Sequence, residues 1–385
     1  MLKFLDLKLD MFGLDISDSS VKLLKLNKKK SGFFEIEFFG QTDIDPGIVE
    51  GGEIKNEEAL VLAIKKVCAS YDGKKLGAKY VVASLPEEKS FLEVISMPKM
   101  EEEELASAIL FEAENYVPLS IDQVYLDFQV IPTDDENLDH LDVLIVAMPK
   151  TTVDSYCSCI KKAGFVPCVL DIESQAQAMA LVKDQFSDSP LILVNFGKKN
   201  SNFTIFSGQS IRFTSSVSVS SSQITDAIAT GFGISGAEAE KLKIGFSLLR
   251  KDESEETKKI YNLILPVLDE LVSQIKKYFS FYRDHVSHEH LHDFKKTSNA
   301  IKDNKIQESK LNDEKIILTG GGSNLNGLAD FISMHTSLKT ELGNIFINVP
   351  FDKNSDGLSI KEKITSSFCT SMGLALRGAV NKELI

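Results

Sequence analysis

The sequence predicts a mixed α/β protein made of two lobes of related design, because one order of elements occurs twice. Over residues 12–39, apolar and polar residues alternate and polar turn residues interrupt the pattern twice, as expected of three strands joined by hairpins. A helix near 56–70 and a buried strand at 79–85 follow. The order restarts with a buried strand at 191–196, which leads into hairpin strands over 202–217. Two α/β units, each opened by hairpins, are therefore expected.

In the first lobe, each element has a local signal. Phe12, Leu14 and Ile16 alternate with other residues, and Ser17-Asp18-Ser19-Ser20 interrupts the run before a second strand. The third strand carries the aromatic run 33–39. The following helix repeats its apolar residues at helical spacing, namely Leu60, Ile64 and Val67. This β-β-β-α-β order is the first structural prediction.

A compact β-α-β-β-α unit is expected within the first lobe, over about 85–165. Its first helix begins at the four acids 101–104, which the helix dipole favours, and Pro118 stops it. Two strands, near 125–131 and 143–148, and a helix at 152–163 complete the unit.

The second lobe is expected to contain a helical part and to end with another strand and a glycine turn. Amphipathic helices are predicted from Ser222 to about His292, and 295–315 is polar enough for a linker. A strand at 316–319 ends in three glycines. The predicted division is 1–86 and 166–188 for the first lobe, 87–165 for the insertion, 189–221 and 316–385 for the second lobe core, 222–294 for its helical part, and 295–315 for the linker.

Composition and charge exclude several classes of function. The 385 residues include 56 acids and 43 bases, so the net charge of -13 disfavours nucleic-acid binding. The same charge disfavours adhesion to anionic lipids. No apolar run approaches the ~20 residues of a membrane-spanning helix. Five cysteines without a CxxC pair indicate a reducing compartment rather than a disulfide framework.

Three strand-ending turns carry the candidate binding chemistry. They are Asp15-Ile16-Ser17-Asp18-Ser19-Ser20, Asn195-Phe196-Gly197-Lys198 and Thr319-Gly320-Gly321-Gly322-Ser323. Two facing hairpin turns that begin with an acid or an amide are suited to the phosphates and the magnesium of a nucleotide. Glycine allows backbone N–H groups to approach phosphate, and carboxylates hold a hydrated metal.

Several further sequence blocks give the chain a family resemblance. They are Gly13-Leu14-Asp15-Ile16-Ser17-Asp18-Ser19-Ser20-Val21-Lys22, Phe111-Glu112-Ala113-Glu114-Asn115-Tyr116-Val117-Pro118, Asp127-Phe128-Gln129-Val130, Ala163-Gly164-Phe165, Asp171-Ile172-Glu173, Thr225-Asp226-Ala227-Ile228, Ala239-Glu240-Lys241-Leu242-Lys243 and Met372-Gly373-Leu374-Ala375-Leu376-Arg377-Gly378. With the three turns, these blocks resemble the PilM family of type IV pilus assembly, which is itself similar to the cell-division protein FtsA. The resemblance covers nearly the whole chain.

The resemblance implies an actin-like ATPase fold, with two ribonuclease-H-like lobes around a nucleotide cleft and an FtsA-type inserted subdomain. It implies ATP or ADP with Mg²⁺ as the cofactor, and Asp15 as a metal contact through water. The residues implied at the nucleotide are Asp15, Ser17, Asp18, Ser19, Ser20, Lys22, Asn195, Gly197, Lys198, Asn200, Glu240, Lys243, Gly320, Gly321, Gly322 and Ser323.

The resemblance also implies a partner and a location. The expected protein is a cytoplasmic scaffold that binds the N-terminal cytoplasmic peptide of a PilN-like membrane protein, near the inserted subdomain. It would reach the inner membrane through this and other pilus assembly proteins, and not through a membrane span of its own.

Three positions depart from the family pattern. Ser17 stands where the family usually has glycine, Asn195 where it usually has an acid, and Ser220-Ser221 where a Gly-Gly pair is frequent. Asparagine is neutral and does not hold Mg²⁺ as a carboxylate does. A serine side chain also crowds a turn that wraps phosphate. Weak nucleotide binding with little or no hydrolysis is therefore expected.

The sequence is also compatible with other functions and with a plainer role for two of the candidate residues. An ATPase or sugar kinase of the same fold would need an acid to orient its nucleophile, and Asp171 or Glu173 lies in the right region. An FtsA-like division polymer would need a C-terminal amphipathic membrane helix, which the residues after Gly378 do not show. Glu240 and Lys243, three residues apart, would also suit an ordinary ion pair on a helix.

Overall fold

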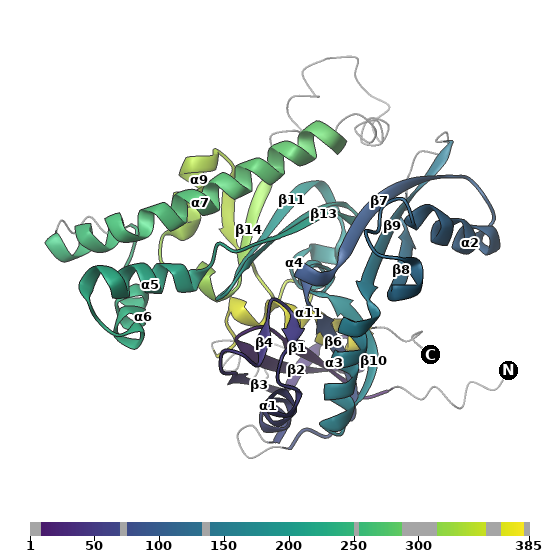
Figure 1. Cartoon of the computed structure of the whole chain (residues 1–385), viewed down its shortest axis with the longest axis horizontal. Helices are drawn as coiled ribbons and strands as arrows, with labels where there is room; N and C mark the ends of the chain where they lie inside the picture. Colours follow the sequence, from purple (N-terminus) through teal and green to yellow (C-terminus); the bar gives the residue numbers. More distant parts are fainter. Residues whose placement is uncertain are drawn as a thin grey trace.

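A computed structural model confirms the mixed α/β architecture with two related sheets (Figure 1). The structure describes residues 9–69, 75–132, 139–249, 254–286, 314–351 and 363–380. The predicted linker at 295–315 lies almost wholly outside these residues; only Glu314 and Lys315 are described.

The first sheet has the strand order β10-β6-β1-β2-β3. It consists of β1 (Met11–Ile16), β2 (Ser20–Lys28), β3 (Phe34–Asp43), β6 (Tyr80–Leu85) and β10 (Val166–Ile172). Strands β1, β2 and β3 pair antiparallel as hairpins, while β6 and β10 run parallel to β1. A short hairpin of β4 (Val49–Glu50) and β5 (Glu53–Ile54) precedes helix α1 (Glu57–Ala69).

The second sheet repeats this topology with the order β13-β12-β11-β14-β15. Its strands are β11 (Ser187–Phe196), β12 (Ser201–Gly208), β13 (Ser210–Val217), β14 (Lys315–Thr319) and β15 (Lys339–Leu342). Strands β11 to β13 are antiparallel, and β14 and β15 run parallel to β11. The repeated hairpin order predicted from the sequence is confirmed.

Helices of the second lobe cover one face of its sheet. They are α5 (Ser221–Phe232), α6 (Gly236–Gly245), α7 (Glu255–Val286) and α9 (Leu328–Thr336). Their apolar side chains form a core with β11, β12 and β14, in which Ile228, Ile264 and Leu318 are fully buried. No helix in the described part of the chain is long and apolar enough to cross a membrane.

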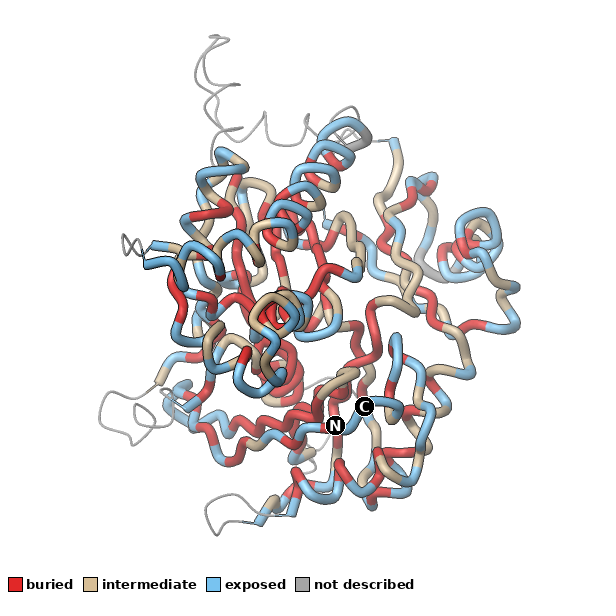
Figure 2. The backbone as a smooth tube through the Cα atoms, turned by 60° about the vertical axis from the view of Figure 1, so that its left-hand side comes forward, coloured by how far each residue is buried: buried red, intermediate tan, exposed pale blue. Residues whose placement is uncertain are grey.

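Two helices lie between the sheets and join the lobes (Figure 1). Helices α4 (Glu173–Leu181) and α11 (Cys369–Val380) share a core with residues of both sheets, such as Leu24 of β2 and Leu193 of β11. Gly373 allows α11 to lie directly against the α4 backbone, because a Cβ there would collide with the Ala176 carbonyl. Figure 2 shows that the backbone is mostly buried in this central region.

The insertion has its own sheet and its own core. Strands β7 (Phe91–Pro98), β9 (His140–Pro149) and β8 (Val124–Val130) form an antiparallel sheet in the order β7-β9-β8. Helix α2 (Glu102–Ala113) packs Leu105, Ile109 and Ala113 against this sheet. The helix begins at the four predicted acids and ends before Pro118.

Helix α3 (Lys150–Lys162) packs differently from the predicted division, which placed it in the insertion. Its buried residues Val153, Tyr156 and Ile160 belong to the core of the first lobe, with α1 and β1. By packing, therefore, α3 is part of the first lobe. The other predicted domain boundaries stay predictions.

Candidate functional site

The topology brings polar strand ends from both lobes to one place. Strands β1, β6 and β10 are parallel neighbours, so their carboxyl ends share one edge of the first sheet. That edge carries Asp15 at the end of β1, Glu87 and Glu88 just after β6, and Glu173 just after β10. Ligands of open α/β sheets bind at such edges.

The first predicted turn closes on itself. The Ser17 amide donates to the Ser20 carbonyl over 3.0 Å, and the Ser20 amide donates to Ser17 Oγ over 3.2 Å. The Ser17 hydroxyl also donates to the Ser20 carbonyl over 3.0 Å. The serine that stands in place of glycine therefore uses the backbone donors that a phosphate would need.

Asp15 and Lys22 are buried together beneath this turn. Lys22 Nζ lies 3.7 Å from Asp15 Oδ2 and donates to Ser20 Oγ over 2.8 Å. Ser84 Oγ donates to Asp15 Oδ1 over 3.2 Å. Burial raises the pKa of Asp15, and Lys22 partly opposes that rise. The Lys22 ammonium is thus already paired with Asp15 and Ser20.

Asp18 and Ser19, also in the first turn, hold neighbouring backbone. The Asp18 carboxylate accepts the Gly51 amide over 2.7 Å and the Gly52 amide over 3.0 Å. The Ser19 carbonyl accepts the Ile44 amide over 3.1 Å. Both residues therefore fix the turn to the chain around the β4–β5 hairpin.

Further carboxylates crowd the same edge of the first sheet. Burial, followed by repulsion from Glu88, Asp15 and Glu87, raises the pKa of Glu173 well above its ordinary value. Burial also raises the pKa of Glu87 and of Glu88. The first lobe therefore presents a row of carboxyl groups, which we call the acidic wall, to the second lobe.

Amides of the second lobe bond directly to this wall. Asn202 Nδ2 donates to Glu173 Oε2 over 2.6 Å, and Asn200 Nδ2 donates to Glu88 Oε1 over 3.2 Å. Asn202 is 1% exposed, and its Oδ1 has no hydrogen-bond partner. We name these two hydrogen bonds the cross-lobe latch. Both hydrogen bonds join the second lobe to the first.

The second and third predicted turns lie against each other. The Gly197 amide donates to the Asn200 carbonyl over 3.0 Å, and Lys198 is exposed. Gly320 has φ of 85°, and a Cβ there would collide with Asn195 Oδ1. Gly320 is thus required both by its backbone conformation and by the close approach of Asn195.

The rest of the third turn is also bonded within the protein. Ser323 Oγ donates to the Gly320 carbonyl over 2.8 Å. Gly322 packs on Phe196, whereas a Cβ at Gly321 would meet open space. Of the three glycines in this turn, Gly321 is the one with no atoms packed against the place of a side chain.

Glu240 and Lys243 form an ion pair with each other. Lys243 Nζ lies 2.7 Å from Glu240 Oε2, and Thr225 Oγ1 donates to the same oxygen over 2.6 Å. Lys243 also donates to Thr225 Oγ1 over 2.9 Å. This network ties α6 to α5. The implied contact of both residues with adenosine stays a prediction.

Sequence reasoning missed part of this site. Asn200 was among the predicted residues, but Asn202, Glu87 and Glu88 were not, and Glu173 was considered only for an enzyme. A signal did exist for the acids, since Glu87-Glu88 and Glu173 each follow a buried strand, as Asp15 ends one. Asn202 gave no signal, because its partner lies 29 residues away on the other lobe.

The residues present fit a magnesium nucleotide only after rearrangement. Phosphate needs free N–H donors and cations, but the Ser17 and Ser20 amides and the Lys22 ammonium are already bonded within the protein. Among the described residues, no three His, Cys, Asp or Glu side chains converge to hold a metal ion.

Comparison with known proteins places the chain in a family. The family model of type IV pilus assembly protein PilM matches residues 13–295 and 304–379. A chain of a PilM-PilN type IV pilus biogenesis complex superposes with a TM-score of 0.76 at 24% identity, covering 97% of this chain and 100% of that one. Ethanolamine utilization protein EutJ from Carboxydothermus hydrogenoformans superposes with a TM-score of 0.52 at 13% identity, covering 95% and 88%. MreB5 of Spiroplasma citri bound to AMPPNP gives 0.49 at 12% identity, covering 92% and 96%. The fold is therefore actin-like, and the chain belongs to the type IV pilus assembly protein PilM family.

Proposed function

We propose that this chain is a cytoplasmic scaffold of type IV pilus assembly that binds the N-terminal cytoplasmic peptide of a PilN-like membrane protein. The observation that carries the proposal is the superposition, over 97% of the chain, on a chain from a complex of PilM with PilN. Membership of the PilM family supports the same role. The partner would bring the protein to the inner membrane.

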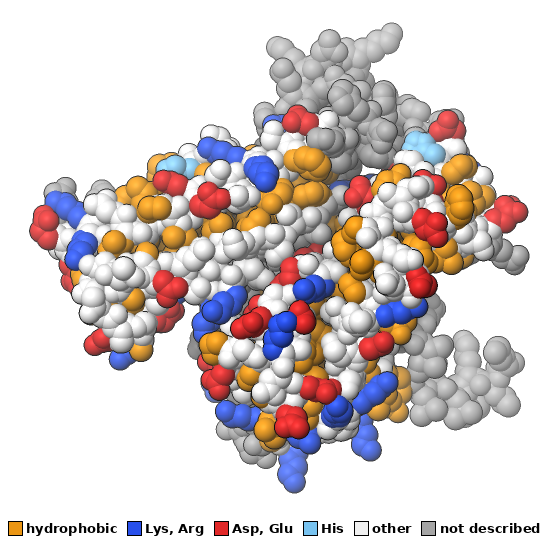
Figure 3. All heavy atoms as spheres, in the orientation of Figure 1, with side chains coloured by type: hydrophobic (Ala, Val, Ile, Leu, Met, Phe, Trp, Pro, Cys, Tyr) orange, Lys and Arg blue, Asp and Glu red, His pale blue; other side chains and the backbone are white. Residues whose placement is uncertain are grey.

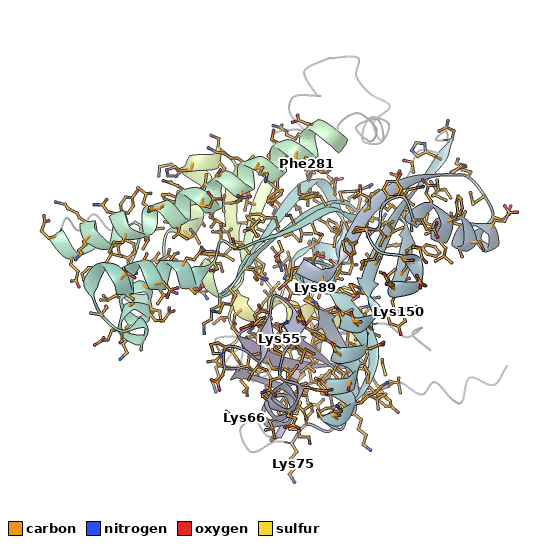
Figure 4. All side chains as sticks on the ribbon, in the orientation of Figure 1. Lys55, Lys66, Lys75, Lys89, Lys150 and Phe281 are labelled. Carbon is orange, nitrogen blue, oxygen red and sulfur yellow. The ribbon has the colours of Figure 1, made fainter. Side chains whose placement is uncertain are left out.

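The edge strand β8 is the place that we propose for this peptide. It is the outer strand of the inserted sheet and lies next to α3 of the first lobe. Tyr125 of β8 donates to Asp154 of α3 over 3.2 Å, and Lys150 lies 5.5 Å from the Tyr125 ring centroid. Figure 4 labels Lys150 at this junction. An extended peptide can add to such a strand edge.

A titration of a synthetic PilN-like N-terminal peptide into the purified chain tests the proposal. We expect binding to the wild type, and roughly tenfold weaker binding to Tyr125→Glu, which places a charge on the β8 edge. Leu62→Glu on α1, where Leu62 is 67% exposed, is the matched control and should bind normally. Failure of the wild type to bind would overturn the function. Equal binding by Tyr125→Glu would overturn only the placement on β8.

We also propose that the cleft between the lobes binds ATP or ADP with Mg²⁺ weakly and hydrolyses ATP little or not at all. Asp15, Ser17, Ser19, Ser20 and Lys22 would take the phosphates and the metal from the first lobe. Asn195, Gly197, Lys198 and the 320–323 turn would face them from the second lobe. The internal bonding of the Ser20 amide and of Lys22 supports weak binding, because these bonds must break before phosphate can take their place. A steady ATPase rate that Asp15→Ala abolishes would contradict the proposal.

A further inference from the structure

Helix α2 of the insertion exposes large apolar side chains on its outer face. Phe111 is 75% exposed and Leu110 is 46% exposed, whereas Leu105, Ile109 and Ala113 on the inner face are buried. An exposed aromatic side chain of this extent on a regular helix needs a reason, since the inner face already supplies the packing. We name the surface of Ala106, Leu110 and Phe111 the outer face of α2.

The segment that carries this face is acidic. Residues 100–121 contain six glutamates and no lysine or arginine, in a chain whose net charge is -13. Glu101, Glu104 and Glu114 are exposed. Figure 3 shows hydrophobic side chains bordered by acidic ones over the insertion.

Helix stability explains only some of these acids. Glu101 to Glu104 lie at the N-terminal end of α2, where the helix dipole favours negative charge. Glu112 and Glu114 lie at its C-terminal end, where the dipole disfavours it, and the last turn has no basic residue. The helix dipole therefore does not account for the acids at the C-terminal end, just as packing on the inner face does not account for Leu110 and Phe111.

We propose that the outer face of α2 docks an amphipathic helical segment of a partner protein that carries lysine or arginine beside its apolar residues. Leu110 and Phe111 would anchor the apolar side of that helix, and Glu101, Glu104 and Glu114 would pair with its cations. An amphipathic helix docks by laying its own apolar face, with anchors at helical spacing, on apolar side chains of its partner. An anionic lipid surface does not fit, because the exposed Glu101, Glu104 and Glu114 would repel it. This surface lies on α2, so it is separate from the β8 edge proposed for the PilN-like peptide.

Fluorescence anisotropy with labelled peptide helices tests this inference on the full chain. The probe is a Leu/Lys amphipathic helix of about four turns. The first control peptide replaces lysine with glutamate, and the second keeps the lysines but replaces leucine with alanine. At physiological salt, we expect the Leu/Lys helix to bind at least roughly tenfold more tightly than either control.

Variants separate docking on α2 from general attraction of a cation to an acidic protein. Phe111→Ser should weaken binding of the Leu/Lys helix roughly tenfold, while Leu62→Ser on α1 should leave it unchanged. Thermal unfolding should be nearly the same for both variants, because both side chains are exposed. Equal binding by Phe111→Ser and the wild type, equal binding of all three peptides, or no binding of the Leu/Lys helix would each overturn the inference.

Discussion

The two lobes have the same strand order but bring different polar groups to the place where their strand ends meet. In the first lobe, the strand ends carry acids, namely Asp15, Glu87, Glu88 and Glu173. In the second lobe, the corresponding region carries amides, namely Asn195, Asn200 and Asn202. The strand order determines where the polar strand ends meet. The residue types there determine whether these groups bond to each other or to a ligand.

The difference makes the lobes complementary. Amide N–H groups of the second lobe donate to carboxylates of the first, which forms the cross-lobe latch. An acidic second lobe would repel the first unless a cation lay between them. The neutral amides allow direct contact instead. The predictions below alter this complementarity, beginning with the junction on which both lobes depend.

Replacing Gly373 with alanine should have the largest effect. The new Cβ would collide with the Ala176 carbonyl, which belongs to the α4 backbone and cannot rotate away. We expect a loss of about 3 kcal/mol or more in the free energy of unfolding, measured with urea. Gly236→Ala on α6 is the control, since a Cβ there meets nothing within 4 Å. Equal stability of the two variants would show that the α4–α11 contact is looser than described.

Asn202→Asp would make the second lobe acidic at the latch. A second carboxylate would then face Glu173 where the amide now donates over 2.6 Å, so one of the two must hold a proton. We expect a loss of about 2 kcal/mol at pH 8. The loss should shrink at pH 5, where a shared proton is available. A loss of the same size at both pH values would argue against a charged partner at this position.

Glu173→Gln should stabilise the protein at high pH. The folded state raises the pKa of Glu173 above its ordinary value of 4.5, so the folded protein binds this proton more tightly than the unfolded chain does. Its stabilising effect is therefore complete below the unfolded pKa and is lost as pH rises through the folded pKa. Glutamine carries no charge and still accepts from Asn202. We expect the unfolding midpoint to rise by roughly 2 °C at pH 8 and to change less at pH 5. A lower midpoint at pH 8 would contradict this reasoning.

Glu240→Gln should have the smallest effect on stability. The Glu240 side chain is 46% exposed, so its ion pair with Lys243 is screened by solvent. We expect a change within about 0.5 kcal/mol in urea unfolding. A larger loss would mean that the network with Thr225 holds α6 to α5 more strongly than an exposed ion pair does.

The repeated lobes could be predicted from the sequence because their signals are local. Alternation over 12–16, the polar turn at 17–20 and the aromatic run at 33–39 each lie within a few residues. The restart at 191 repeats the same local pattern. The packing of α3 on the first lobe could not be predicted in this way, because its apolar face does not specify which of two neighbouring cores it joins.

The candidate site could be predicted only in part. The three turns are continuous segments, and glycine and serine mark them locally. The cross-lobe latch depends instead on pairs separated by 29 and 112 residues. The Ser17 hydroxyl also does more than crowd the turn, since it accepts the Ser20 amide and donates to the Ser20 carbonyl. Such bonds depend on the conformation of the turn, which residue type alone does not fix.

The central claim is that the polar groups where the lobes meet bond to each other and are therefore not available to a nucleotide. Calorimetric titration of magnesium ATP into the wild-type chain tests this claim most directly. Asn200→Ala/Asn202→Ala, which lacks both hydrogen bonds of the latch, would be titrated in parallel. We predict no micromolar binding by the wild type, and tighter binding by the double variant, because its cleft opens without breaking those bonds. A micromolar dissociation constant for the wild type, equivalent to about 8 kcal/mol of binding free energy, would contradict the account.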